Sequence, residues 1–530
     1  MTGGFSYRLL RPYARFTRME PYKNWSREEL IARLQQLDPH HDRPRPAHQQ
    51  EPLRKAKPFD FNAYPKRKIA LKFTYNGIHY GGMEFQKDPV LPTVEGVLFD
   101  ALVHTKLVDR EGGLEGCGWQ RCGRTDKGVS AGGQVVSLWV RSSSNAKAAV
   151  TENTENAPES QEAQPTPDPD TQESAEDGPG LEGDFGLMGD LDEPPTNGSM
   201  PAKPPPQESA EDDNCAYVYK LNHILPPTIR ILAWSPVADD FSARHSCRWR
   251  HYKYFFSPKG LDLAAMSDAA ARLVGEHDFR NLCKIDPGKQ LTVFTRRILH
   301  ASIDPVDPAR TSGDGVLYVF NLRGNAFLYN MVRHIMAILF LVGTGLEHPS
   351  VMTALLNADP ANPLPPFREG EPAPPVVTGK PEYIIADPLP LMLWECGYDE
   401  GALDWRVDPA KTQGGETAKS PLRGMMCAHE RAVIGAALEE HFLKAAEKHH
   451  TPPKPYFPIG APGVDALSPG AMMSLPLGGG MVKRAATYTP LLERKRMLTP
   501  EEVNERYRLG RGAKRLERRA AAAAVDDVDE

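Results

Sequence analysis

Residues 141–214 place the strongest constraint on how this chain of 530 residues folds. The stretch is rich in Pro, Glu, Ser, Gln and Asp and has few large apolar residues, so it cannot recover the entropy that ordering costs. We therefore expect a disordered insertion that divides one folded body into two parts. A solvated spacer is the commoner role of such a segment, and an acidic mimic of RNA is the alternative.

The acidic charge is concentrated in the same region. Residues 151–214 hold 18 Asp and Glu against the single Lys203, a local net charge of −17. Because the whole chain carries −6, the remainder carries about +11. The body is therefore basic, as expected of a protein with a polyanionic partner. The seven cysteines are scattered without a CxxC pair, which predicts reduced thiols in an intracellular protein and no zinc site.

Residues 67–140 read as the first part of the folded body. A strand over residues 69–75, a helix capped by Thr93 and a strand over residues 134–140 follow one another. The strand–helix–strand order predicts an α/β layer.

A polar turn, RCGRTDKGVSA over residues 121–131, precedes the strand over 134–140. Its one carboxylate, Asp126, lies among the cations Arg121, Arg124 and Lys127. Neighbouring cations favour the charged form, so we expect Asp126 to be ionised and available as a nucleophile or a base. A surface turn with a local ion pair is the alternative, and composition alone favours it.

Two further stretches carry candidate site residues. Tyr252, Tyr254 and Phe256 alternate along a strand, a pattern that core packing also explains. The segment from Gly324 to Ile335, whose apolar residues continue to Leu341, reads as a buried helix that contains Arg333. An unpaired buried charge is costly, so we expect an acidic partner for Arg333. The alternative is an arginine that reaches solvent at the end of the helix.

These stretches resemble the TruA-type tRNA pseudouridine synthases. Residues 123–131, GRTDKGVSA, match the family's catalytic motif at nine consecutive positions, and the motif's essential Asp falls on Asp126. Residues 250–254, RHYKY, match the family's Arg-x-Tyr-x-Tyr, whose first Tyr lies against the reacting uridine; here it is Tyr252. Arg333 matches the arginine that pairs with the catalytic acid.

The resemblance implies an α+β fold, in which two ferredoxin-like halves form one continuous mixed sheet with helices on one side. It implies isomerisation of uridine to pseudouridine in tRNA without a cofactor or a metal, by a homodimer that binds no membrane. Phosphate contacts position an RNA, and Arg124, Lys127, Arg244 and Arg250 are the expected RNA-binding residues.

The extensions indicate a branch of the family. A short helix expected over residues 26–37 and a basic tail over 491–519 resemble the eukaryotic members that modify positions 38 and 39 in the anticodon arm. The alternatives are a non-catalytic tRNA-binding or chaperone protein on the same fold, and a member acting at other tRNA positions. Glycoside hydrolysis usually needs two carboxyl groups, and the Asp126 motif has one.

The expected organisation has five parts. They are a basic extension with a short helix and a linker (1–66), the first part of the catalytic domain (67–140), the acidic insertion (141–214), the rest of the catalytic domain (215–400) and a C-terminal extension (401–530). We expect the protein in the nucleus and cytoplasm. The Arg-rich first 18 residues read as a basic arm, with mitochondrial targeting as the alternative.

Overall fold

The computed structural model describes residues 59–87, 89–142, 216–310, 315–407, 421–451 and 473–514. The chain divides into a unit of residues 1–60 and a unit of residues 61–530, and the folded body belongs to the second. The helix expected over 26–37 and nearly all of the acidic insertion lie outside the described residues.

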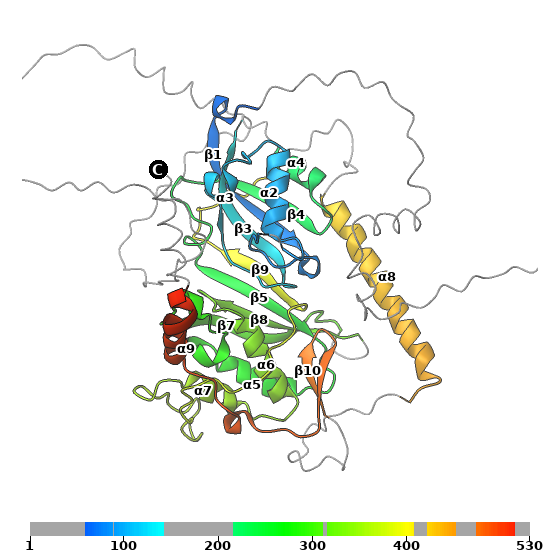
Figure 1. Ribbon diagram of the computed structural model, residues 1–530. Helices are drawn as coiled ribbons and strands as arrows, with labels where there is room; N and C mark the ends of the chain where they lie inside the picture. The colour runs from blue at the N-terminus through cyan, green and yellow to red at the C-terminus, as the bar shows by residue number, and fades with distance from the viewer. Residues whose placement is uncertain are drawn as a thin grey trace, which may run out of the picture. The chain divides into compact units, whose positions relative to one another are not determined.

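A mixed sheet of nine strands forms the centre of the body (Figure 1). Its strands are β1 (Lys66–Tyr75), β2 (Gln120–Arg121), β3 (Ser130–Arg141), β4 (Ile229–Pro236), β5 (Trp249–Phe256), β6 (Gly275–Asp278), β7 (Thr295–Pro305), β8 (Tyr318–Gly324) and β9 (Leu391–Gly397). The strand order is β4-β1-β3-β9-β5-β8-β7-β6, and β2 pairs with β3. The pair β3–β9 is parallel, with Ser130 opposite Met392, and the other pairs are antiparallel.

Helices cover this sheet, so the architecture is mixed α+β. The α-helices are α2 (Val94–His104), α3 (Gly113–Gly116), α4 (Tyr217–Ile224), α5 (Leu263–Ala271), α6 (Met331–Gly343), α7 (Ser350–Leu356), α8 (Pro421–Glu447) and α9 (Pro500–Tyr507). Short 3-10 turns include η2 (Phe61–Ala63), η3 (Gly77–His79), η4 (Arg280–Leu282), η5 (Pro287–Lys289) and η7 (Leu491–Glu493), and a π-turn, η8 (Arg508–Gly512), follows α9. Figure 1 shows α2 and α4 in front of the first strands and α5 and α6 in front of the later ones.

The predicted elements of the first part are present. The Thr93 hydroxyl accepts a hydrogen bond from the Gly96 N–H over 3.2 Å and so caps α2. Leu98 and Leu102 of α2 are fully buried, as the helical spacing of its apolar residues predicts. The strands expected over 69–75 and 134–140 lie within β1 and β3.

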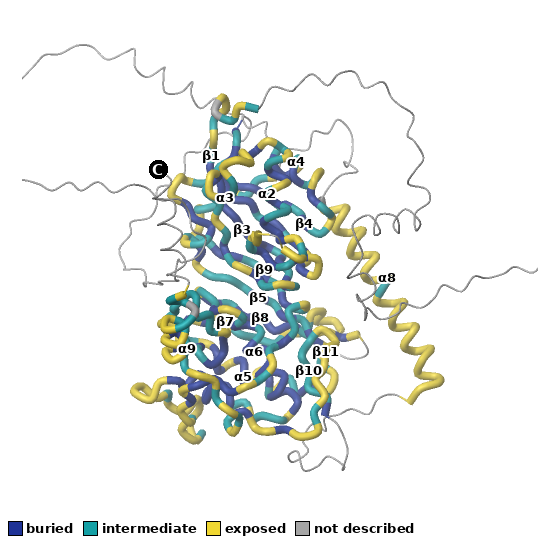
Figure 2. The backbone as a smooth tube through the Cα atoms, in the orientation of Figure 1, coloured by how far each residue is buried: buried dark blue, intermediate teal, exposed yellow. Residues whose placement is uncertain are grey.

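The core extends along the central strands and under the helices (Figure 2). Helix α6 begins at Met331, within the segment in which we expected a buried helix, and nearly all of its residues are buried. Tyr254 and Phe256 lie against Phe340 of α6, with ring centroids 6.1 Å and 6.0 Å away. Alternation along β5 thus places its aromatic side chains in the core.

Part of the C-terminal extension belongs to the same body, which its weak pattern did not predict. A hairpin of β10 (Met473–Gly478) and β11 (Met481–Ala485) lies beside α6. The Leu477 carbonyl accepts hydrogen bonds from the Asp387 N–H over 2.6 Å and from the Tyr254 hydroxyl over 3.3 Å. The side chains of α8, which also belongs to the C-terminal extension, are largely exposed.

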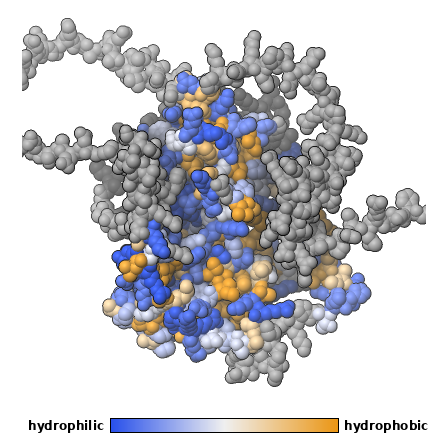
Figure 3. Space-filling view, in the orientation of Figure 1, coloured by the Kyte–Doolittle hydropathy of each residue, from blue (hydrophilic) through white to orange (hydrophobic). Residues whose placement is uncertain are grey.

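The face drawn in Figure 3 carries hydrophilic side chains with a hydrophobic patch near α6. Within the described ranges, no helix combines the length and the apolar character needed to cross a membrane.

Candidate active site

The loop between β2 and β3 carries Asp126 and is anchored to the sheet. The side-chain amide of Gln134 donates to the Gly123 carbonyl over 2.8 Å. The hydroxyls of Tyr75 and Thr125 share a buried hydrogen bond of 2.6 Å. Because these partners come from β1 and β3, the sheet itself sets the position of the loop.

The other end of the loop depends on glycine. A Cβ at Gly77 would lie 2.1 Å from the Val129 carbonyl oxygen, so only glycine allows η3 to approach this closely. The Gly77 N–H donates to the Ser130 hydroxyl over 3.0 Å. At Gly128, φ is +84°, which glycine adopts at little cost.

Arg333 reaches the Asp126 carboxylate from the first turn of α6. Its Nη1 lies 3.9 Å from Asp126 Oδ2. Its Nε donates to the Ala386 carbonyl over 2.8 Å, and Nη1 donates to Asn330 Oδ1 over 3.2 Å. The structure therefore brings together the two residues that the sequence predicted as partners. Both side chains are partly shielded from water, which strengthens their attraction.

The pKa of Asp126 is raised above its ordinary value, because burial raises it more than Arg333 and Lys284 lower it. We expected neighbouring cations to favour the charged form, and the net effect has the opposite sign. A carboxylate with a raised pKa is a stronger base when it is ionised.

The cations next to Asp126 in the sequence point to other partners. Arg124 pairs with Glu84, with 3.1 Å between Nη2 and Oε1. Lys127 is exposed. Arg121, the third cation of the motif, also pairs with Glu84, at 2.9 Å. The cations next to Asp126 in the sequence therefore affect its pKa less than Arg333 and Lys284 do.

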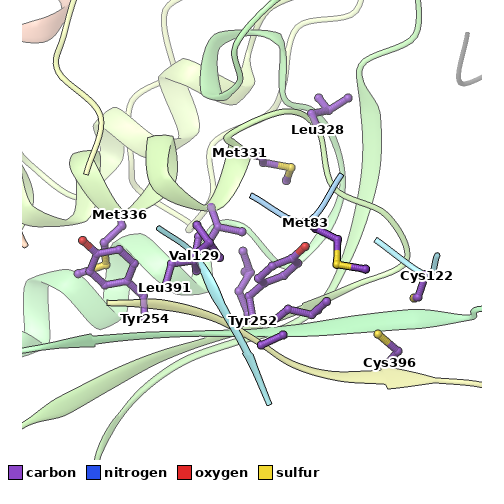
Figure 4. Packing of buried hydrophobic residues seen from close by; sticks show 14 of the residues in the cluster. Met83, Cys122, Val129, Tyr252, Tyr254, Leu328, Met331, Met336, Leu391 and Cys396 are labelled. Carbon is purple, nitrogen blue, oxygen red and sulfur yellow. The ribbon is translucent and has the colours of Figure 1, made fainter. Parts of the chain in front are cut away.

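Tyr252 is buried on β5, and its ring lies edge-on to Phe327, with 4.8 Å between centroids and 75° between planes. Figure 4 shows this ring between Val129, which belongs to the Asp126 loop, and Met83, whose N–H donates to the Thr125 carbonyl of that loop over 3.1 Å. Burial raises the pKa of the Tyr252 hydroxyl, so the phenol stays protonated at neutral pH. Within the described part of the chain, that hydroxyl makes no hydrogen bond.

Of the other predicted RNA-binding residues, Arg244 is half-buried near Arg124. The guanidinium of Arg250 is turned inward. It donates to the carbonyls of Asn325 over 2.8 Å and Cys122 over 2.9 Å. These contacts tie β5 to the start of the Asp126 loop.

Sequence reasoning missed two residues near the site. Lys284 is exposed, with its ammonium 5.0 Å from the ring centre of Tyr329, and nothing in the sequence marks it. Glu95 is fully buried and accepts from Arg121 over 2.6 Å and from the Trp119 indole over 2.7 Å. Its position in the first turn of a helix signalled only a favourable interaction with the helix dipole.

Among the described residues, no three His, Cys, Asp or Glu side chains are placed to hold a metal ion, and the six cysteines are free thiols. A cavity of about 330 Å³ lies between α6 and β10, and its lining includes Leu341, Ile384 and Leu475 but neither Asp126 nor Tyr252. Catalysis at Asp126 would therefore take place outside this cavity.

A shielded carboxylate beside an arginine and a buried tyrosine, with exposed cations around it, is the arrangement expected of an enzyme that uses one carboxyl group on an anionic substrate. The sequence profile of a family described as tRNA pseudouridine synthase matches residues 269–399. That range contains Arg333.

Individual relatives extend the match. The chain is 32% identical over 514 residues to the tRNA pseudouridine(38/39) synthase of Saccharomyces cerevisiae, covering 92% of this chain and 91% of the yeast protein. It is 36% identical over 356 residues to the human protein of the same name, covering 66% of this chain and 59% of that one. The bovine protein gives 35% over 355 residues, 66% of this chain and 59% of that one. The chain belongs to the TruA family of tRNA pseudouridine synthases.

Proposed function

We propose that the protein isomerises uridine to pseudouridine at position 38 or 39 of tRNA. The name tRNA pseudouridine(38/39) synthase, shared by the yeast, human and bovine relatives, supports both the reaction and the position. The observation that carries the assignment of the site is the 3.9 Å approach of Arg333 to Asp126.

The reaction rearranges one nucleotide without a net gain or loss of atoms. The glycosidic bond between C1′ and N1 breaks, the base rotates, and a bond forms between C1′ and C5. C5 loses its proton and N1 gains one. The target base must leave its stack to reach Asp126, as enzymes that act on bases generally require.

Asp126 acts at the sugar, by one of two routes. As a nucleophile it attacks C1′ and displaces the base. As a base it removes the proton at C2′, which allows the glycosidic bond to break. In both routes Arg333 orients the carboxylate, and Tyr252 lies against the base. A fixed cation beside the carboxylate needs no reorganisation during the reaction.

The exposed cations contact the RNA backbone in this proposal. Arg124 and Lys127 flank Asp126 in its loop and are assigned to phosphates near the target uridine. Arg244 lies close to Arg124 and serves the same phosphates. Arg250 supports this cationic surface from the protein interior, by donating a hydrogen bond to the Cys122 carbonyl.

We infer from family membership that the sheet is the pseudouridine synthase fold. One ferredoxin-like half contributes β1 to β4, and the other contributes β5 to β9. The catalytic domain then comprises residues 67–140 and 215–400, and the protein is a homodimer of the nucleus and cytoplasm. Light scattering measures the dimer mass directly.

The test is pseudouridine mapping, by carbodiimide labelling and primer extension, on tRNA transcripts treated with wild-type protein, Asp126→Asn or Asp100→Asn. The control residue Asp100 is an exposed acid on α2. We expect signal at position 38 or 39 with wild type and with Asp100→Asn, and a loss of about 10²-fold or more with Asp126→Asn.

Two other outcomes contradict parts of the proposal. Signal at another position keeps the chemistry and rejects the assignment to 38 and 39. Tight tRNA binding without any pseudouridine would identify a binding protein on the same fold.

A further inference from the structure

One short segment before β9 contacts both members of the Asp126–Arg333 pair. Ala386 is bound to Arg333 twice: its N–H donates to the Arg333 carbonyl over 3.2 Å, and its carbonyl accepts from Arg333 Nε over 2.8 Å. Pro388 lies against the loop of the other member, since a Cβ at Gly128 would be 3.3 Å from Pro388 Cγ. The segment therefore touches both α6 and the Asp126 loop.

A single peptide group in this segment joins Arg333 to the C-terminal extension. It is the group between Ala386 and Asp387, and its carbonyl is the acceptor for Arg333 Nε. Its N–H belongs to Asp387 and donates to the Leu477 carbonyl of β10 over 2.6 Å. A peptide group is planar, so fixing the direction of the N–H also fixes the direction of the carbonyl. The Leu477 carbonyl therefore sets the orientation of the acceptor that Arg333 uses.

The Tyr254 hydroxyl adds a second contact between the segment and the hairpin. It lies 3.0 Å from the Asp387 carbonyl oxygen and 3.3 Å from the Leu477 carbonyl oxygen, and it can donate its one hydrogen to either. The Tyr254 side chain is fully buried. A hydrogen bond that is shielded from water is stronger than an exposed one, so this hydroxyl helps to hold the two backbones in one arrangement.

The turn of the hairpin has a glycine where it meets Tyr254. At Gly478, φ is +86°, and a Cβ there would lie 2.0 Å from the Tyr254 hydroxyl oxygen. At Gly480 of the same turn, φ is +78°, but a Cβ would meet nothing within 4 Å. The backbone conformation favours glycine at both positions, whereas the close approach to Tyr254 requires it only at Gly478.

We propose that Leu477 is a positioning residue: through the peptide group that it fixes, it aims Arg333 at the Asp126 carboxylate. This inference rests on the proposed function, since it concerns the pair to which catalysis is assigned there. The hairpin lies beside α6 (Figure 1) and outside the range matched by the family profile. The C-terminal extension thus supports the reaction although it contributes no reacting group.

The experiment displaces the hairpin and measures kcat and KM for a tRNA transcript across the acidic pH range. A substitution of Leu477 would leave its carbonyl in place, so the test variant is Gly478→Ala, whose methyl group collides with the Tyr254 hydroxyl. Gly480→Ala is the matched control, because it strains the same turn without a collision. Arg333→Gln is the reference for complete loss of the guanidinium. Thermal unfolding shows which variants are folded.

We expect Gly478→Ala to lower kcat at least about tenfold and to change KM less, because it misplaces a group of the reacting site. The acidic limb of kcat/KM should move to higher pH, as for Arg333→Gln, since a displaced guanidinium stabilises the ionised Asp126 less. Lys284 also lowers the pKa of Asp126, but its N–H is bound to the Tyr329 carbonyl and its effect should remain. The control should match wild type in kcat and in the acidic limb.

A double variant tests whether the hairpin acts through Arg333. Gly478→Ala combined with Arg333→Gln should have the acidic limb of Arg333→Gln alone, because no guanidinium remains to be aimed. A further shift in the double variant, or an unshifted limb in folded Gly478→Ala, would overturn the inference. If Gly478→Ala does not fold, Tyr254→Phe replaces it, since it removes only the hydroxyl. A smaller shift in the same direction is then expected, and an unshifted limb rejects the inference.

Failure of the proposed function gives a different result. A wild-type protein that forms no pseudouridine would refute the proposed function and this inference with it. An active wild type whose acidic limb is shared by Gly478→Ala would refute the inference alone.

Discussion

Asp126 illustrates at the scale of one residue how burial and charge oppose each other. Burial raises its pKa, and the cations Arg333 and Lys284 lower it by a smaller amount. The carboxyl remains the partner of Arg333 at 3.9 Å. The reactivity of Asp126 therefore depends on Arg333, which can be substituted without changing the sequence of the Asp126 loop.

Arg333→Gln should move the acidic limb of the profile of kcat/KM against pH to higher pH. Removing the cation destabilises the ionised carboxylate, so the pKa of Asp126 rises further. Activity that requires the ionised form is lost as pH falls through that pKa, and the loss then begins at a higher pH. Rate measurements across the acidic range test this. Arg333→Lys keeps the charge and should shift the acidic limb less. If wild type and both variants lose activity at the same pH, Arg333 does not influence the pKa of Asp126.

Glu95 is a second residue whose environment predicts a large effect, this time on stability. Glu95→Ala leaves Arg121 without its buried partner, and breaking such a pair costs about 3 kcal/mol or more. Asp100→Ala on the same helix breaks an exposed pair with Arg110 and should cost about 0.5 kcal/mol or less. Urea denaturation compares the two. Similar small losses would mean that Glu95 contributes no more than a surface charge.

At the scale of elements, the Asp126 loop depends on the turn that follows β1. The turn η3 approaches the loop so closely that Gly77 lies against the backbone of Val129. Neither η3 nor the Asp126 loop would form this contact by itself. It exists because β1 and β3 are paired, with Tyr75 opposite Ala131.

Gly77→Ala should reduce kcat at least about tenfold, because the new methyl group must displace the loop and small misplacements of a catalytic group are costly. Gly116→Ala is the matched control, since a Cβ there meets nothing within 4 Å. Steady-state kinetics with thermal unfolding separates the loss of rate from the loss of fold. A fully active Gly77→Ala would show that the loop adjusts freely.

At the scale of the whole molecule, the sheet joins segments from both sides of the acidic insertion. β3 precedes the insertion and pairs in parallel with β9, which comes much later. The flanks of the insertion are also close, since the Tyr217 hydroxyl donates to the Arg141 carbonyl over 3.2 Å. The body therefore does not need the insertion to connect its parts over a long distance.

Replacing residues 151–214 with a short Gly-Ser linker should preserve pseudouridine formation and tighten tRNA binding at low salt. The replacement removes a net charge of −17, which repels an RNA approaching the basic body. Binding at two salt concentrations checks the electrostatic origin of the effect. Loss of activity in a folded variant would instead give the insertion a direct role.

The sequence by itself determined many of the local elements. Alternation predicted β1, β3 and the aromatic face of β5, an N-cap predicted α2, and an apolar run predicted α6, because local spacing decides which side chains share a face. Resemblance supplied Asp126, Tyr252 and Arg333. The strand β7, the hairpin β10–β11 and helix α9 were not predicted, since tertiary contacts stabilise them more than their own patterns do.

Only the tertiary structure decided which charges act on one another. The cations nearest to Asp126 in the sequence turn to Glu84 or to solvent, and the more distant Arg333 and Lys284 act on the carboxylate instead. It also decided that Arg250 faces inward and that the C-terminal hairpin reaches the peptide group that holds Arg333. The physical reason is that electrostatic effects follow distance and burial in the folded protein, and sequence spacing fixes neither across a sheet built from distant segments.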